Sequence, residues 1–402
     1  MIHIIDKSKC CGCNACVQRC PKQCITMQED EEGFLYPVVD QSICIDCDLC
    51  EKVCPVINSN ESRQPLQVFA AKNRNEDQRL RSSSGGIFIL LAEHIIKQGG
   101  VVFGARFDKN WEVEHAYAET LEELEPLMRS KYVQSRIGNT YKEAEQFLKQ
   151  GRQVMFVGTP CQIVGLKKFL RKEYENLLAV DFICHGVPSP GIWRKYLEEI
   201  KSKRSEAVVK NMVLSSSIKS LPVITSINFR EKQLGGYSWK KYGFVVHAKS
   251  PFKGNQNTVL LSNIFFENTF MKGFLADLYL RPSCYNCPAK AGKSCSDLTL
   301  GDFWGINKYN FDDDKGTGAI ILYTIKSENI IKSIQIEKES TNYCEVANLN
   351  PAIYLSVILT KKRSNFWQYY NKVHDIESSI LYALKPNLKE KIRSKLKKIL
   401  RK

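Results

Sequence analysis

Short apolar runs and stretches with helical apolar spacing alternate along most of the chain after residue 66. The runs are of strand length and predict buried strands at 68–71, 101–105, 154–158, 177–183 and 319–323. Between them, the spacing of apolar residues predicts helices at 87–97, 160–171 and 188–203. Strands that alternate with helices in this way are typical of an α/β layer structure.

The remaining segments divide the chain into parts. A less regular section predicts a pair of antiparallel strands at 223–229 and 242–248. Residues 58–62 are polar and predict a linker. We therefore predict an α+β protein with three parts, a small domain at 1–57, a larger α/β domain at 66–355 and a basic helical tail at 361–402.

The tail ends in a basic amphipathic pattern. Within 388–402, lysines and arginines surround an apolar face made of Ile392, Leu396, Ile399 and Leu400. Such a segment is either an interfacial helix or a solvated surface helix. The first alternative would place a cytoplasmic protein at the inner face of a membrane.

The first 55 residues contain eight cysteines in a duplicated pattern. The run C-x2-C-x2-C-x3-C-P occurs twice, offset by 34 residues, at Cys10, Cys13, Cys16 and Cys20 and at Cys44, Cys47, Cys50 and Cys54. This is the bacterial ferredoxin run, in which three close thiolates hold one cubane and the fourth cysteine reaches the other. One 4Fe-4S cluster is therefore predicted at Cys10, Cys13, Cys16 and Cys54, and a second at Cys20, Cys44, Cys47 and Cys50.

Other chemistry fits this pattern poorly. A zinc site has no use for a third cysteine in each run, and a disulfide knot needs a secreted chain. Radical chemistry on S-adenosylmethionine needs C-x3-C-x2-C, which Cys20 and Cys24 begin, but Met27 stands at the third position. Cys11 and Cys24 lie outside both runs and are predicted to pack as spare thiols near the clusters.

The composition indicates the cellular compartment of the protein and the kind of partner that it binds. We expect no signal peptide, and the most apolar stretch, 87–96, is too short to span a bilayer. Sixteen cysteines in a reducing, cytoplasmic setting indicate metal binding rather than disulfides. The formal charge is +15, which favours an acidic redox partner or anionic lipid, because no nucleic-acid motif accompanies the basic residues.

A second group of cysteines lies in the larger domain, at Cys161, Cys184, Cys284, Cys287 and Cys295. Cys161 and Cys184 follow predicted strands, and the ends of neighbouring strands are where α/β sheets bind ligands. From spacing alone, this group is a zinc site, a third cubane or a set of scattered core thiols.

Several short segments of residues 66–350 resemble the beta-subunit family of coenzyme F420 hydrogenases and dehydrogenases. They are S-S-S-G-G at 82–86, S-K-Y-V at 130–133, G-T-P-C-Q at 158–162, C-H-G at 184–186, the pair Cys284 and Cys287, and D-L-T-L-G at 297–301. Two features, C-H-G and the ending G-D-F-W-G at 301–305, resemble a bacterial branch whose genes are often found beside those for surface polysaccharides. The resemblance implies FAD and a further 4Fe-4S cluster held by Cys161, Cys184, Cys284 and Cys287, with Cys295 as a substitute for Cys184.

The resemblance also implies a flavin site made of Ser83, Ser84, Gly85, Gly86, Lys131, Tyr132 and Thr159. The residues support part of this, because free backbone N–H groups at a helix start suit the FAD pyrophosphate, and no G-x-G-x-x-G motif is present. The alternatives are an ordinary serine-capped helix and a solvated Lys131. Asp302 and His185 stand at likely strand ends and are candidates either for proton handling or for structure. No catalytic residue is assigned.

A flavin beside a chain of clusters joins a hydride carrier to a one-electron partner. We therefore expect an iron–sulfur flavoprotein oxidoreductase that relays electrons between a hydride carrier or small-molecule substrate and a redox partner protein. That partner would be a ferredoxin or a catalytic subunit. The alternative is a non-catalytic electron-transfer adaptor that docks on a separate enzyme, for example in surface polysaccharide biosynthesis.

Overall fold

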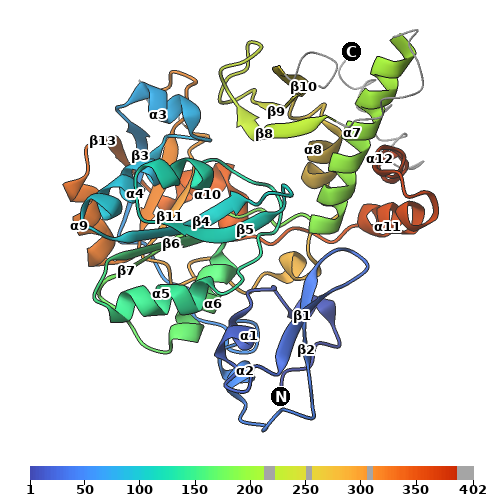
Figure 1. Ribbon diagram of the computed structural model, residues 1–402. Helices are drawn as coiled ribbons and strands as arrows, with labels where there is room; N and C mark the ends of the chain where they lie inside the picture. The colour runs from blue at the N-terminus through green and yellow to red at the C-terminus, as the bar shows by residue number, and fades with distance from the viewer. Residues whose placement is uncertain (212–221, 250–255, 306–310, 387–402) are drawn as a thin grey trace, which may run out of the picture.

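The computed structural model describes residues 1–211, 222–249, 256–305 and 311–386, with residues 204–211 described by their backbone alone. These residues form a small N-terminal domain, a larger domain built on a mixed sheet, and a closing helical section (Figure 1). The predicted helix at 388–402, and with it the predicted membrane contact, lies outside the described residues. Within them, no helix has the length and apolar character that crossing a membrane requires.

The centre of the larger domain is an eight-stranded sheet in the order β13-β3-β12-β11-β7-β6-β4-β5. Its parallel part consists of β4 (Val101–Phe107), β6 (Val154–Gly158), β7 (Leu177–Phe182) and β11 (Leu298–Asp302). The strands that pair antiparallel are β3 (Gln67–Asn73), β5 (Val113–Ala118), β12 (Gly318–Leu322) and β13 (Ile336–Thr341). The carboxyl ends of the four parallel strands therefore meet at one edge of the sheet, which we call the carboxyl edge.

Helices cover both faces of this sheet. They are α4 (Ile87–Lys97) and α9 (Ile325–Ser333) on one face and α5 (Thr140–Lys149) and α6 (Pro160–Leu170) on the other. Successive residues of β4 alternate between the two cores, since Val101 and Phe103 pack with α5 and α6 whereas Val102 packs with α4. Burial on both faces explains why these strands are almost continuously apolar in sequence.

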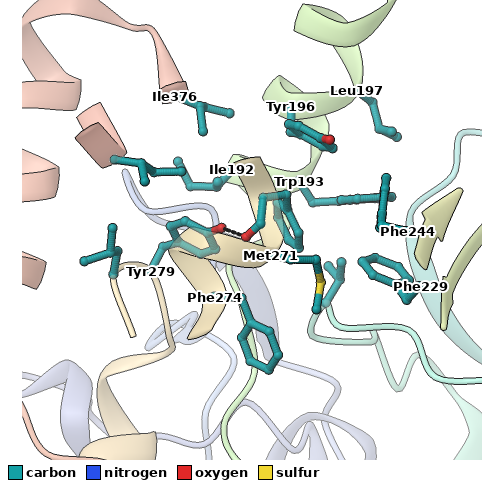
Figure 2. Close-up of a cluster of buried hydrophobic side chains, with 14 of the residues drawn as sticks. Ile192, Trp193, Tyr196, Leu197, Phe229, Phe244, Met271, Phe274, Tyr279 and Ile376 are labelled. Carbon is teal, nitrogen blue, oxygen red and sulfur yellow. Dashed lines mark hydrogen bonds between the residues drawn. The ribbon is translucent and has the colours of Figure 1, made fainter. Parts of the chain in front are cut away.

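A second core lies beside the sheet (Figure 2). The elements around it are β8 (Val223–Glu231), β9 (Gly243–Lys249), β10 (Asn257–Ile264), α7 (Pro190–Asn211), α8 (Thr269–Leu275), α11 (Lys361–Val373) and α12 (Ile376–Leu384). Trp193 of α7 is fully buried, and its ring centroid lies 5.2 Å from that of Phe229 on β8. Phe366 and Ile376 are buried in the same core, so the described part of the predicted tail packs against the domain.

The N-terminal domain contains two segments with corresponding backbone conformations. Its helices, α1 (Ala15–Arg19) and α2 (Leu49–Lys52), begin at positions that correspond under the offset of the cysteine runs. Each helix follows a residue in the left-handed conformation, Asn14 with φ of 63° and Asp48 with φ of 55°. Between them, β1 (Ile25–Glu29) and β2 (Leu35–Val39) pair antiparallel. The duplication in sequence is therefore also a duplication in structure.

The N-terminal domain packs directly on the larger domain. Gly165 of α6 leaves no room for a side chain, because a Cβ there would lie 2.8 Å from the Cβ of Cys13. The side-chain carbonyl of Gln18 accepts hydrogen bonds from the backbone N–H groups of Tyr141 and Lys142, each at 3.1 Å. These contacts hold α1 against the start of α5 and the middle of α6, and bring the first cysteine run close to the sheet.

Candidate metal and cofactor sites

Two pockets in the N-terminal domain are each lined by four of the predicted ligands. The pocket that we call proximal is lined by Cys10, Cys13, Cys16 and Cys54. The pocket that we call distal is lined by Cys20, Cys44, Cys47 and Cys50. Each covers about 340 Å³ of space between atoms, part of which is open to solvent. In both, three thiols come from one run and the fourth from the other, which is the exchange of ligands that two adjacent cubanes require.

The chemistry of these thiols suits an iron cluster. Burial raises the pKa of Cys16 to about 12, so this thiol ionises only where a cation compensates its charge. The backbone N–H of Ile2 donates to Cys50 Sγ at 3.3 Å, a contact of the kind that tunes cluster sulfur. Within the described ranges, no three His, Cys, Asp or Glu side chains converge on the position of a single metal ion. The two sets of four cysteines are therefore defined by the pockets that they line, and not by side chains that meet at one point.

The two cysteines outside the runs each lie beside a pocket. Cys24 lines the distal pocket, with its Sγ 3.4 Å from that of Cys20. Cys11 is buried and lines the proximal pocket, and the thiols of Cys13 and Cys161 both act on its pKa, which lies well above its usual range. Cys11 therefore connects the proximal pocket to the cysteines of the larger domain.

Four cysteines of the larger domain come together at the carboxyl edge of the sheet. Cys161 lies in the first turn of α6, directly after β6, and Cys184 follows the end of β7. Cys284 lies in a 3₁₀ helix, η4 (Pro282–Asn286), and Cys287 is its C-cap. We call these four residues the third cysteine group.

Backbone contacts fix the loops of the third cysteine group side by side. The N–H of Val187 donates to Cys284 Sγ at 3.4 Å. The buried ammonium of Lys290 donates to the Cys184 carbonyl at 2.7 Å. The segment after β7 and the loop with the C-x2-C pair are thereby held together.

The four thiols also act on one another electrostatically. Burial, and then Cys284 among the neighbours, raises the pKa of Cys184. Burial raises the pKa of Cys284 to about 12 and that of Cys287 to about 11, and Cys161 acts on both. These interactions link Cys184 to the other three thiols, and Cys295 stays the alternative fourth member.

The serine loop, residues 82–86, fits a tight corner between β3 and β12. A Cβ at Gly85 would lie 2.5 Å from the carbonyl oxygen of Ala71 and 2.5 Å from the nitrogen of Gly318. Gly86 is the N-cap of α4 with φ of 76°, and no side chain caps the helix. The serine-capped helix is therefore not what forms, and the first N–H groups of α4 receive no side-chain cap.

The second predicted flavin segment lies against the serine loop. Ser83 Oγ accepts a hydrogen bond from the Ser130 N–H at 2.8 Å. The Lys131 ammonium donates to a backbone carbonyl at 2.7 Å, and burial lowers its pKa to about 7, so this amine is not a solvated surface group. Tyr132 stacks on Phe274 with 5.0 Å between ring centroids.

Thr159 contacts a different part of the carboxyl edge. It is the N-cap of α6 and forms a capping box with Gln162. Its Oγ1 lies 3.2 Å from Cys161 Sγ. These contacts place Thr159 with the third cysteine group rather than with the serine loop.

Arg230 on β8 is a candidate binding residue that sequence reasoning missed. Its side chain is buried and one Nη donates to Asp302 at 2.5 Å, but its Nε and other Nη have no hydrogen-bond partner among the described residues. The rings of Tyr242 and Trp304 lie over the guanidinium, at 4.4 and 5.6 Å. Buried donors without an acceptor are costly, so this guanidinium suits a ligand with oxygen acceptors. Its one signal in the sequence is that it directly follows the strand predicted at 223–229.

Arg230 and the serine loop belong to the same part of the larger domain. The carbonyl of Thr317 accepts hydrogen bonds from Ser84 Oγ and from the N–H of Phe303, both at 2.9 Å. Phe303 follows Asp302, the partner of Arg230. An oxygen-rich group held there would meet a cation, a helix start and serine hydroxyls, and these residues fit a flavin dinucleotide.

The two candidates for proton handling are engaged in fixed contacts. Asp302 binds Arg230 and also accepts a hydrogen bond from Trp239 Nε1 at 3.2 Å. His185 Nε2 lies 2.6 Å from Asp277 Oδ1, near Phe274. Both arrangements are consistent with a structural role.

Comparisons with known proteins match two segments of the chain to described families. Residues 151–349 match the family described as the C terminus of the coenzyme F420 hydrogenase/dehydrogenase beta subunit, and residues 9–58 match a 4Fe-4S dicluster domain. No curated protein matches the chain. A chain from a solved structure of the F420-reducing NiFe hydrogenase complex of Methanosarcina barkeri is 14% identical, with a TM-score of 0.45, over 73% of this chain and 88% of that chain.

The protein is thus an iron–sulfur protein that joins a ferredoxin-like dicluster domain to a mixed α/β domain. Residues 151–349 form a C-terminal domain of the kind found in the oxidoreductases of the coenzyme F420 hydrogenase/dehydrogenase beta-subunit family, and residues 9–58 form a 4Fe-4S dicluster domain. The matched region includes all of the third cysteine group, whereas the segments at 82–86 and 130–132 precede it.

Proposed function

We propose that this protein is an iron–sulfur flavoprotein oxidoreductase, which relays electrons between a hydride carrier at a bound FAD and a one-electron partner protein. A flavin exchanges a hydride for single electrons, and a 4Fe-4S cluster carries one electron at a time. The observation that carries the proposal is the sequence of thiol groups from the carboxyl edge of the sheet outward, namely the third cysteine group, the proximal pocket and the distal pocket.

The surroundings of Cys11 and Cys13 support this order. Cys11 lines the proximal pocket, and the thiol of Cys161 in the third cysteine group acts on its pKa. The missing side chain of Gly165 allows α6 to approach Cys13 closely. Cys47 of the distal pocket is exposed, so a partner protein would reach the molecule at this end.

The flavin part of the proposal rests on the surroundings of Arg230. Two unpaired guanidinium nitrogens, the uncapped start of α4 and the hydroxyls of Ser83 and Ser84 lie in one region. The buried side-chain amine of Lys232, which donates to the Ser84 carbonyl at 3.4 Å, adds a group that is positive when protonated. These residues would bind and orient FAD, and the carboxyl edge would bring its ring toward the third cysteine group.

Turnover by the purified chain tests the proposal. After anaerobic reconstitution with iron, sulfide and FAD, the protein is mixed with NADH, NADPH or reduced coenzyme F420, and reduction of benzyl viologen is followed. Turnover that is lost in Arg230→Met and kept in Arg106→Met, a surface arginine paired with Glu114, supports the proposal. If none of the three donors is oxidised although dithionite reduces the clusters, the chain is better described as an electron-transfer adaptor for a separate enzyme.

A further inference from the structure

Arg281 is a buried cation that has no carboxylate partner among the described residues. Its side chain is 1% exposed. Nε donates to the Cys10 carbonyl at 2.7 Å, Nη1 to Gln134 Oε1 at 2.9 Å and Nη2 to the Leu35 carbonyl at 2.9 Å. All three partners are neutral oxygens, so they satisfy the donors but leave the positive charge uncompensated. The guanidinium stays protonated in proteins, so deprotonation cannot remove this charge.

The other buried arginines in the described part of the chain do have such a partner. Arg79 pairs with Asp313, and Arg230 pairs with Asp302. An isolated charge in the protein interior is strongly unfavourable unless a charge of opposite sign lies close by. The position of Arg281 therefore requires an anion that is not a side-chain carboxylate.

Cysteine groups lie on two sides of Arg281. Nη2 lies 3.6 Å from Cys10 Sγ in the proximal pocket. Along the chain, the N–H of Cys284 donates to the Arg281 carbonyl at 2.9 Å, and the guanidinium charge acts on the thiols of Cys284 and Cys161. The same cation thus faces the proximal pocket and the third cysteine group.

The neighbourhood is shaped to hold the guanidinium in this place. The Tyr36 and Phe34 rings lie 4.3 and 5.3 Å from it, and aromatic faces stabilise a cation while they exclude water. A Cβ at Gly12 would lie 2.7 Å from Nη1, so the first cysteine run reaches Arg281 only because this residue is glycine.

We propose that Arg281 is a positioning residue for electron transfer. The iron–sulfur clusters of the proximal pocket and the third cysteine group neutralise its positive charge, and this charge raises the reduction potential of both clusters. The inference rests on the clusters of the proposed function. An oxidised cubane with four thiolates carries about two negative charges, and reduction adds one electron without breaking a bond. A fixed cation stabilises the more negative, reduced form by a larger amount, and it does so strongly in a buried site.

The test is a redox titration of the full-length, reconstituted protein, with dithionite as reductant and the clusters followed by electron paramagnetic resonance. In Arg281→Met, we expect the reduced-to-oxidised ratio of two clusters to fall about tenfold at a given potential, which corresponds to about 59 mV for one electron. The remaining cluster, in the distal pocket, keeps its potential. Arg281→Lys, which retains the charge, shows a smaller shift.

A second variant tests the charge without removing the arginine. Gln134→Glu places a carboxylate where Gln134 Oε1 already accepts from Nη1 at 2.9 Å, and it is expected to lower the same two potentials. This variant decides the question if Arg281→Met does not fold.

The matched control is the double variant Arg363→Met with Glu32→Gln. Arg363 also joins the larger domain to the N-terminal domain, but Glu32 already neutralises it. Unchanged potentials in this control, with shifted ones in Arg281→Met, support the proposal. Unchanged potentials in Gln134→Glu, or equal shifts in the control, would overturn it. A wild-type chain that binds no iron would contradict the proposed function itself.

Discussion

The N-terminal domain and the larger domain position their cysteines in different ways. In the N-terminal domain, each pocket takes three thiols from one short loop, whose turns depend on local residues such as Gly12 and Asn14 in the left-handed conformation. In the larger domain, the thiols come from α6, from the end of β7 and from η4, which are far apart in the sequence. The first arrangement depends on local sequence, whereas the second exists only when the sheet is complete.

The largest effect is expected from loss of a ligand in the N-terminal domain. Cys54→Ser removes the thiol that the second run contributes to the proximal pocket, so the chain should lose about four irons. Iron and sulfide analysis of the purified protein measures this. Cys344→Ser, at an exposed thiol outside all three groups, is the control and should keep its iron. Full iron content in Cys54→Ser would remove this cysteine from the ligand set.

The same experiment on the larger domain separates its two candidate ligands. Cys184→Ser should lose about four irons and keep the signals of the N-terminal clusters, because Cys184 interacts with the other thiols of the third cysteine group. Cys295→Ser is the matched control and should keep all its iron. The opposite result would show that Cys295 is the ligand.

Weakening the second core should destabilise the larger domain more than the N-terminal domain. Trp193→Ala leaves a large cavity beside Phe229, and such changes typically destabilise a protein by about 3–5 kcal/mol. In a urea titration, we expect the cluster of the third cysteine group to be lost at a lower urea concentration than in the wild type. The urea concentration at which the N-terminal clusters are lost should change less. Leu381→Ala, at an exposed position of α12, is the control. Equal shifts for all clusters would show that the domains unfold as one unit.

A smaller effect is expected at the proposed flavin site. Arg230→Met removes two buried donors, and hydrogen bonds to charged groups contribute about 1.5–3 kcal/mol, so FAD affinity should fall roughly tenfold to a hundredfold. Quenching of flavin fluorescence on binding measures this. Arg106→Met should bind FAD as the wild type does. Unchanged affinity in Arg230→Met would exclude this residue from the flavin site.

The smallest effect concerns pH. Burial lowers the pKa of Lys232 to about 7 in the folded protein, whereas an unfolded chain keeps this amine protonated up to about pH 10.4. Between these values the unfolded state binds more protons, so the free energy of unfolding rises with pH, by at most about 1.4 kcal/mol per pH unit. In the FAD-free protein, Lys232→Met should flatten this rise, and Lys315→Met, which removes a surface ion pair, should not. Identical slopes in both variants would contradict a neutral Lys232.

The apolar pattern predicts much of the sheet and of the helices that cover it. Strands β3, β4, β6, β7 and β12 all begin within one residue of the predicted runs, and α4 has the predicted bounds. By contrast, β13 has Ile336 as its one buried residue, so it carries almost no apolar signal. The charged composition after residue 361 predicts a tail, yet Phe366 is fully buried in the second core.

The candidate sites likewise divide into those that the sequence pattern predicts and those that it does not. Spacing alone predicts the ligands of the proximal and distal pockets, because three thiols of each lie within one loop. The third cysteine group needed a family resemblance, since only the folded sheet brings Cys161 and Cys184 together. Arg230 and Arg281 belong to no sequence motif, because the atoms that give each residue its role come from segments far away in the chain.

The central claim is that this chain holds three clusters and a flavin in contact across two domains. An anaerobic count of iron, sulfide and released flavin on the purified full-length chain tests it most directly. The account predicts about twelve irons and one FAD per chain. About eight irons without flavin would contradict it, because only the clusters of the N-terminal domain would then remain.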